Sequence, residues 1–107
     1  MTTPNLPPID LIPRDWEIVC DILTRHAPQY EVWAFGSRAK HTAKKYSDLD
    51  LAIITDQPLD LSFSADITNA FEESDLSIKV DVVDWASTDE IFRQIIQREK
   101  IVIQKAI

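Results

Sequence analysis

Apolar residues recur at helical spacing in three segments of the chain. From about residue 14 to residue 26 they recur every three to four positions, which predicts a helix that Pro13 can begin. A second helical face lies within residues 63–71. A third helix should follow residues 87–90, whose Ser-x-x-Glu spacing is that of a capping box, with an apolar face formed by Ile91, Phe92, Ile95 and Ile96.

Segments rich in β-branched and aromatic residues lie between these helices and predict strands at residues 30–35, 48–55 and 78–85. Gly36 and Ser37 end the first strand, and residues 38–46 are polar enough for a loop or a short helix. The tail, residues 101–107, fits either a short strand or a helix end. Strands that alternate with helices indicate an α/β (α+β) fold, a small mixed sheet with helices on one face and the other face partly open.

The length of 107 residues fits a single domain, which we expect to span residues 14–107. The first 13 residues hold four of the six prolines and predict an extended N-terminal arm. No leader pattern and no apolar run of about 20 residues is present, so we expect a cytoplasmic protein. The single cysteine, Cys20, excludes an internal disulfide, and its helical spacing favours a core position over a catalytic role.

The chain is acidic, with a net charge of −7 from 11 basic and 18 acidic residues. Proteins that bind nucleic acid usually present a basic face to the phosphates, so this balance argues against general nucleic-acid binding. It allows the binding of a single nucleotide and favours a basic protein partner in a hetero-oligomer. One basic cluster interrupts the acidic background, at Arg38, Lys40, Lys44 and Lys45.

Gly36 is the only glycine of the chain, whereas average usage of about 7% would supply several. Its position at the end of a predicted strand suggests a turn with positive φ, or a place where a ligand approaches the backbone. The amides that follow, together with the Ser37 hydroxyl, could then hold phosphate oxygens. An ordinary turn glycine is the simpler alternative for this residue taken alone.

Two carboxylates, Asp48 and Asp50, lie two positions apart in the second predicted strand. Side chains alternate across a strand, so both carboxylates point to one face and Leu49 and Leu51 point to the other, towards the core. Carboxylates held about 7 Å apart repel each other unless a cation lies between them. Hard divalent cations such as Mg²⁺ prefer such oxygen ligands. A solvated strand face is the alternative, although aspartate is a poor strand former.

A third carboxylate, Asp81, lies in the third predicted strand. If that strand neighbours the second, Asp81 lies beside the first two carboxylates. Three carboxylates can hold two metal ions, which suits an in-line phosphoryl displacement, and Asp81 could also accept the proton of the acceptor. Asp84 is the alternative third carboxylate. Side-chain alternation, however, places it on the opposite face with Val80, and at the strand end it should cap the turn.

These three stretches together resemble the motifs of the polymerase-β-like nucleotidyltransferase superfamily: Gly-Ser-Arg-Ala at residues 36–39, Ser-Asp-Leu-Asp-Leu at 47–51 and Val-Asp-Val at 80–82. The chain is most similar to its minimal (MNT) branch, antitoxins found beside HEPN-domain toxins in prokaryotes, over about residues 14–105. The resemblance implies the nucleotidyltransferase fold, ATP as substrate and Mg²⁺ as cofactor. It also implies a HEPN-domain toxin, or a similar small helical protein, as the partner that receives AMP on a tyrosine.

The resemblance also implies a role for each matching residue. Asp48, Asp50 and Asp81 would bind the metal and be catalytic, and Asp81 would help to activate the acceptor. The nucleotide-binding residues would be Gly36, Ser37, Arg38 and Lys45. A solvated basic loop is an equal alternative for Arg38 and for the lysines at positions 40, 44 and 45.

One departure from the family pattern is His41, which stands where a second glycine is common. We expect this histidine to be solvated, and its presence puts the loop conformation in question. Three functions are compatible with these sequence features. The chain could be an active AMP-transferring antitoxin, or a non-catalytic binding module that neutralises its partner by complex formation. A nucleotidyltransferase acting on a small molecule is the third, but no segment offers an obvious pocket for one.

Overall fold

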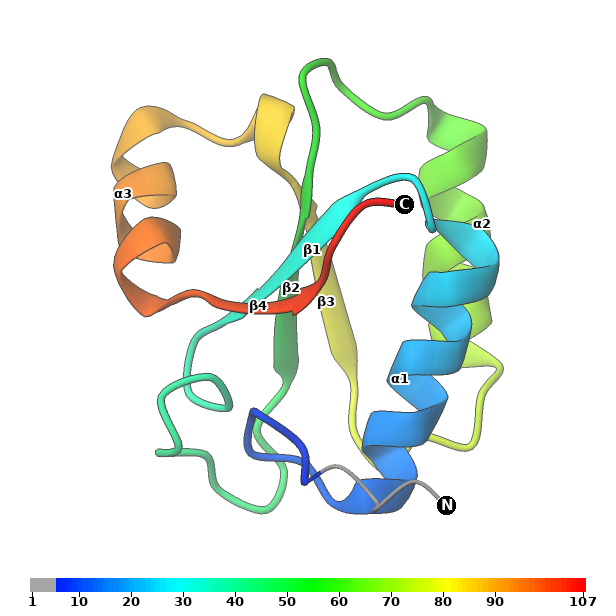
Figure 1. Cartoon of the computed structure of the whole chain (residues 1–107), viewed down its shortest axis with the longest axis vertical. Helices are drawn as coiled ribbons and strands as arrows, with labels where there is room; N and C mark the ends of the chain where they lie inside the picture. The colour runs from blue at the N-terminus through cyan, green and yellow to red at the C-terminus, as the bar shows by residue number, and fades with distance from the viewer. Residues whose placement is uncertain (1–5) are drawn as a thin grey trace.

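The computed structural model describes residues 6–107 and arranges four strands of this part of the chain in one mixed sheet (Figure 1). The strand order is β3-β2-β1-β4; β1 runs antiparallel to both of its neighbours, and β2 and β3 run parallel. The predicted mixed α/β fold is therefore confirmed. In chain order the elements are α1 (Pro13–His26), β1 (Glu31–Phe35), β2 (Leu49–Ile54), α2 (Leu61–Glu72), β3 (Val80–Asp84), the 3-10 helix η1 (Trp85–Ser87), α3 (Glu90–Glu99) and β4 (Ile101–Gln104).

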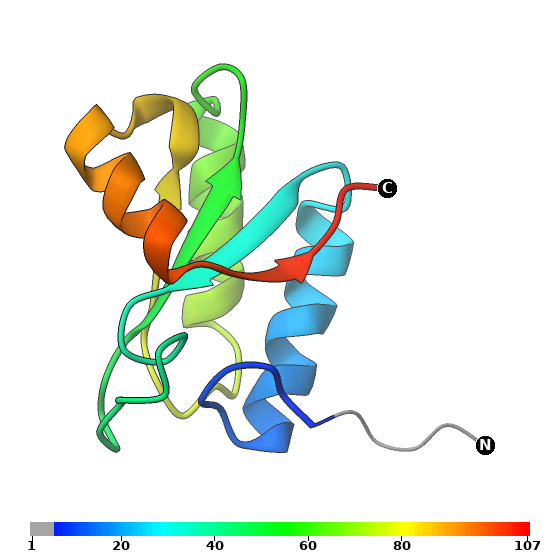
Figure 2. The same ribbon diagram turned by 60° about the vertical axis from the view of Figure 1, so that its left-hand side comes forward.

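Helices cover both faces of the sheet, which corrects the prediction that they cover only one. α1 and α2 lie on one face and α3 lies on the other (Figures 1 and 2). The reason lies in β1, which is apolar on both faces: Val32 and Ala34 enter the larger core, whereas Trp33 and Phe35 face α3. Ile96 of α3 is fully buried against this second group. Part of the α3 face stays open, since Asp50 on β2 and Asp81 on β3 remain partly exposed there.

Two sequence expectations about element ends are settled by the structure. The tail that fitted a strand or a helix end forms β4, which pairs with β1 at the sheet edge. The predicted capping box at the start of α3 is wrong: Asp89 is the cap, and its carboxylate accepts a hydrogen bond from the Phe92 amide. Ser87 belongs to η1, where its hydroxyl donates to Asp84.

Asp84 organises the turn after β3, as its position at the end of the predicted strand indicated. Its carboxylate accepts hydrogen bonds from the Thr55 hydroxyl, the Leu59 amide at 2.7 Å and the Ala86 amide at 3.2 Å. Burial alone would raise the pKa of Asp84, but these hydrogen bonds outweigh it and hold the pKa below its ordinary value. The Asp84 carboxylate therefore has a structural role in this turn. Asp81 is the carboxylate of β3 that lies on the α3 face with Asp50.

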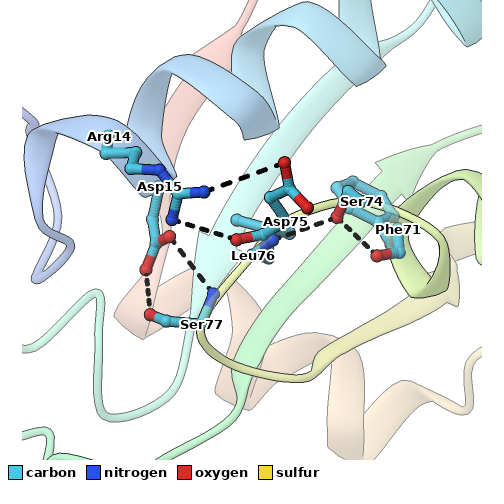
Figure 3. Close-up of polar contacts among 7 residues, drawn as sticks. All are labelled: Arg14, Asp15, Phe71, Ser74, Asp75, Leu76 and Ser77. Carbon is cyan, nitrogen blue, oxygen red and sulfur yellow. Dashed lines mark hydrogen bonds and ion pairs between the residues drawn. The ribbon is translucent and has the colours of Figure 1, made fainter.

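A buried carboxylate at the start of α1 anchors the connection that leads into β3 (Figure 3). Asp15 is only 2% exposed. It accepts hydrogen bonds from the Ser77 hydroxyl at 2.5 Å and the Ser77 amide at 3.3 Å. Beside it, the Arg14 guanidinium donates to the Asp75 carbonyl at 3.1 Å. These contacts join α1 to the segment that positions β3.

The described part of the N-terminal arm, residues 6–12, packs against the domain, because Ile9 and Leu11 are buried in the larger core. The first five residues of the predicted arm lie outside the described residues. Cys20 is only partly buried, and burial raises the pKa of its thiol. None of the helices formed by residues 6–107 is long and apolar enough to cross a membrane.

Candidate active site

Gly36 directly follows the last residue of β1, Phe35, which pairs with Asp50 of β2. Its φ is +76°, in the left-handed region that glycine adopts without strain. A Cβ atom at this position would collide with the Oδ2 atom of Asp50. Both features that could require a glycine are therefore present: a positive φ and a close approach to the backbone. An ordinary turn would require only the first.

Asp50 lies at this glycine on the open part of the α3 face, with Asp81 on the neighbouring strand and Asp48 two positions before it. Asp50 lies opposite Asp81 in the parallel register of β2 and β3, which places their backbones about 4.8 Å apart. Asp48 immediately precedes β2 and has the same parity as Asp50. Leu49 and Leu51 are fully buried in the larger core on the opposite face, as predicted.

The negative charges of these side chains act on one another. Burial raises the pKa of Asp50 above its ordinary value, and the charge of Asp81 adds to this effect. The charges of Asp48 and Glu99 raise the same pKa further. The Lys79 ammonium lies 3.7 Å from Asp81 Oδ1, but both side chains are about half exposed or more, so the pair is screened by solvent. The site thus concentrates negative charge around Asp50.

Glu99, at the C-terminal end of α3, was not among the residues predicted from the sequence. Its Oε1 accepts a hydrogen bond from the Gly36 amide at 3.0 Å, and its Oε2 lies 3.3 Å from the Lys40 ammonium. Within the sequence it belongs to a run of charged residues that is typical of a solvated helix end. Only the return of the chain from α3 into β4, beside β1, brings it to Gly36.

Arg38 has a different environment from the one predicted. It is 7% exposed, and its guanidinium is directed at main-chain carbonyls rather than into the carboxylate site. These carbonyls belong to Asp10, Ser47, Lys44 and Lys45, at 2.7, 2.9, 3.4 and 3.3 Å. The Asp10 amide in turn donates to the Arg38 carbonyl at 2.8 Å. In the structure Arg38 thus joins the N-terminal arm to the loop that carries Asp48, and its predicted phosphate contact stays a prediction.

We expect Arg38→Ala to lower the free energy of unfolding by about 2–4 kcal/mol, because the buried guanidinium is lost and several partly buried carbonyls lose their donor. Arg38→Lys should recover only part of this loss, since an ammonium has three donors on one nitrogen, whereas the guanidinium donates from three nitrogens to separate carbonyls. Urea denaturation followed by circular dichroism measures both. If Arg38→Ala left stability unchanged but weakened nucleotide binding, Arg38 would act as the predicted phosphate contact and not by holding the loop.

The remaining predicted phosphate contacts lie around the same loop. Ser37 follows Gly36, and its carbonyl accepts a hydrogen bond from the Thr42 amide at 2.9 Å, which closes the turn. Lys45 is exposed, with its ammonium 5.4 Å from the centre of the Tyr46 ring. Lys40 is paired with Glu99. Of the basic cluster, Lys40 is therefore the residue whose ammonium the structure places against the site.

His41 resolves the question raised by the missing second glycine. It is exposed and has a φ of +59°, so it keeps the left-handed conformation that a glycine would adopt. Such a conformation costs a non-glycine residue about 1–2 kcal/mol. The substitution therefore strains the loop locally, and the turn that follows Gly36 is still formed.

The donor set suits Mg²⁺ bound together with a nucleotide. Within residues 6–107, no three Asp, Glu, His or Cys side chains are close enough to form a metal cluster by themselves. Mg²⁺ is commonly held by one or two carboxylates and by substrate phosphates, so a cage made only of protein side chains is not required. Asp50 and its neighbours offer hard oxygen donors whose mutual repulsion a cation would relieve.

Comparisons with known proteins agree with this geometry. Residues 19–106 match the polymerase beta nucleotidyltransferase family. Over 97 residues the chain is 52% identical to a probable protein adenylyltransferase, MntA, of Haemophilus influenzae. This match covers 91% of the present chain and 85% of the relative.

Two solved structures share the fold. One is a toxin–antitoxin crystal structure with AMP-PNP, with a TM-score of 0.71 and 22% identity over 85% of this chain and 73% of that one. The other is a tri-AMPylated Shewanella oneidensis HEPN toxin in complex with its MNT antitoxin, with a TM-score of 0.63 and 18% identity. That match covers 87% of this chain and 71% of the other. At these identities the similarity concerns the fold alone.

Proposed function

The chain belongs to the polymerase beta nucleotidyltransferase family, and from this premise we propose that it is an antitoxin that transfers AMP from ATP to a HEPN-type toxin partner. The proposal includes Mg²⁺ as the cofactor, with Asp48, Asp50 and Asp81 as its ligands. The observation that carries it is the register of Asp50 opposite Asp81, on the face where Gly36 leaves room for the Asp50 carboxylate. A solvated strand face would need neither the glycine nor the cluster of like charges.

Each residue has a distinct part in the proposed transfer. The Gly36–Ser37 turn would hold phosphate oxygens through its amides and the Ser37 hydroxyl. Asp81 would orient the acceptor hydroxyl and take its proton. Mg²⁺, when bound, would neutralise charge on the reacting phosphate and on its leaving group. Lys45 and Arg38 stay proposed phosphate contacts, and Arg38 also holds the loop in place through its contacts with main-chain carbonyls.

Several observations favour a protein as the acceptor. The relative of 52% identity is called a probable protein adenylyltransferase, and the toxin in the Shewanella complex is AMPylated. The net charge of −7 suits a partner with a basic surface. The α3 face also leaves Asp50 and Asp81 partly exposed, so a side chain of a docked protein could reach them.

The decisive measurement follows a label from ATP to the partner. The chain is mixed with a HEPN-domain toxin as the proposed partner, with ATP labelled at the α-phosphate, and with either Mg²⁺ or EDTA. We expect label on the partner only with Mg²⁺. Label from ATP carrying it at the γ-phosphate should stay off the partner, because AMP and not phosphate is transferred.

The non-catalytic alternative makes a different prediction for the same mixture. If the two proteins form a stable complex by gel filtration but no label reaches the partner, the chain acts as a binding module. Label on a small molecule in place of the partner would favour the third function. Neither result is expected from a site that keeps all three aspartates.

A further inference from the structure

We propose that Glu99 occupies the phosphate-binding position of the site in the free protein and leaves it when a nucleotide binds. This inference deepens the proposed function and rests on it. It gives the last residue of α3, absent from the three sequence motifs, a direct effect on nucleotide affinity.

The contacts of Glu99 are those that a phosphate group would make. One carboxylate oxygen accepts a hydrogen bond from the Gly36 amide at 3.0 Å, and the other lies 3.3 Å from the Lys40 ammonium. A main-chain amide at a glycine turn and a lysine ammonium are common phosphate ligands in nucleotide-binding proteins. A nucleotide phosphate held by the Gly36 turn therefore needs a donor that Glu99 already uses.

Besides these two favourable contacts, Glu99 lies near enough to Asp50 for the two negative charges to interact. Its charge contributes to the raised pKa of Asp50, so the two carboxylates repel each other. Movement of Glu99 towards solvent relieves this repulsion. A nucleotide that arrives with a divalent cation brings positive charge to Asp50 and takes the donors from Glu99 at the same time.

Glu99 can leave the site without a change in the fold. It is the last residue of α3, and the next residue, Lys100, is already extended, with φ −61° and ψ 141°. The Glu99 side chain is 22% exposed, so it has access to solvent. Rotation of this side chain frees the Gly36 amide and Lys40, while α3 stays attached to the sheet through the buried Ile96.

The single glycine makes this contact directly measurable. An untagged chain labelled with ¹⁵N-glycine gives one backbone amide resonance, that of Gly36, because the sequence has no other glycine. The resonance is recorded for the wild type, Glu99→Gln and Glu99→Ala, each alone and titrated with MgATP. Glu90→Gln, at the exposed first turn of the same helix, is the matched control.

We expect the free wild type and free Glu99→Ala to differ clearly in the Gly36 resonance, and the two MgATP complexes to coincide. Glu99→Gln keeps an oxygen that can accept the Gly36 hydrogen bond but removes the charge, so it should bind MgATP about 5-fold more tightly or better. Glu90→Gln should match the wild type in resonance and affinity. Glu99→Gln also covers the case in which Glu99→Ala fails to fold.

Two results would overturn the inference. The first concerns the position of the Gly36 resonance. If the wild-type and Glu99→Ala complexes with MgATP differed as much as the two free proteins do, Glu99 would remain bound to the Gly36 amide. The other is weaker MgATP binding by Glu99→Gln, which would make Glu99 a ligand of the complex. The absence of any MgATP response in all variants would reject both this inference and the proposed function. If MgATP displaced Glu99 from Gly36 as expected but no label from ATP reached the partner, only the proposed function would be rejected.

Discussion

Replacement of both Asp48 and Asp50 by asparagine is expected to reduce AMP transfer to the partner by a factor of at least about 10³. Asparagine keeps the size of each side chain but removes the charge that a divalent cation requires. The loss corresponds to about 4 kcal/mol of transition-state stabilisation, which is a typical contribution of metal-ion and electrostatic catalysis. The rate of label transfer from ATP measures it, with the partner in excess.

The same variant is expected to be as stable as the wild type, or slightly more stable. The pKa of Asp50 is raised in the folded protein, so its ionised form opposes folding at neutral pH, and a neutral asparagine removes that effect. Thermal denaturation at pH 7 tests this point. A large loss of stability would show that these carboxylates hold the fold together, and lost activity could then not be assigned to chemistry.

A charge-matched control is available in the same chain. Asp56 and Asp66 are exposed and lie in the β2–α2 connection and in α2, away from the α3 face. The double variant Asp56→Asn, Asp66→Asn has the same net charge as the active-site variant and should transfer AMP at the wild-type rate. If the active-site variant kept more than a tenth of the activity, the assignment of Asp48 and Asp50 would be wrong.

Protection of cells from the toxin partner distinguishes the enzyme hypothesis from the binding-module hypothesis. A catalytic antitoxin that has lost both aspartates should still form the complex but no longer neutralise its partner. A module that acts by covering the partner should neutralise it equally well in both forms. Growth with the partner induced, together with recovery of the complex by affinity purification, measures both properties.

Local patterns predicted the parts of this fold that depend on local chemistry. Alternation placed Asp48 and Asp50 opposite the buried Leu49 and Leu51, and the place of Asp84 at the strand end indicated that it caps the turn. Each of these follows from the geometry of a single strand. The position of Asp81 beside Asp50 depended on strand order and remained conditional until the β2–β3 register was known.

The features that were missed depend on contacts between distant segments. Glu99 reaches Gly36 across 63 positions of sequence, and Arg38 reaches the Asp10 carbonyl across 28. Neither partner is visible in a local pattern, because a charged helix end and a basic loop look the same whether solvated or engaged. The need for a helix on the second face of the sheet could have been predicted from β1. Its residues Trp33 and Phe35 alternate with Val32 and Ala34, and all four are apolar. An apolar strand with two buried faces requires cover on both sides.

Gly36→Ala is expected to lower both stability and activity. A left-handed φ costs alanine about 1–2 kcal/mol, and the added Cβ would collide with Asp50 Oδ2. The Asp50 carboxylate must then rotate away from the Gly36 turn. We expect the free energy of unfolding to fall by about 1–3 kcal/mol, and AMP transfer to fall by about 10²-fold or more, because displacement of a catalytic group by about 1 Å can have an effect of that size.

His41→Ala is the matched control, because it places alanine at the other left-handed residue of the same loop. His41 is exposed and already has a φ of +59° without the freedom of glycine. Its replacement should therefore change stability by no more than about 0.5 kcal/mol and leave AMP transfer within a few-fold of the wild type. If Gly36→Ala behaved like His41→Ala in urea denaturation and label transfer, the close approach of Gly36 to Asp50 would have no role in the site. The positive φ of Gly36 would then have no measurable cost for alanine either, because His41→Ala introduces no new strain.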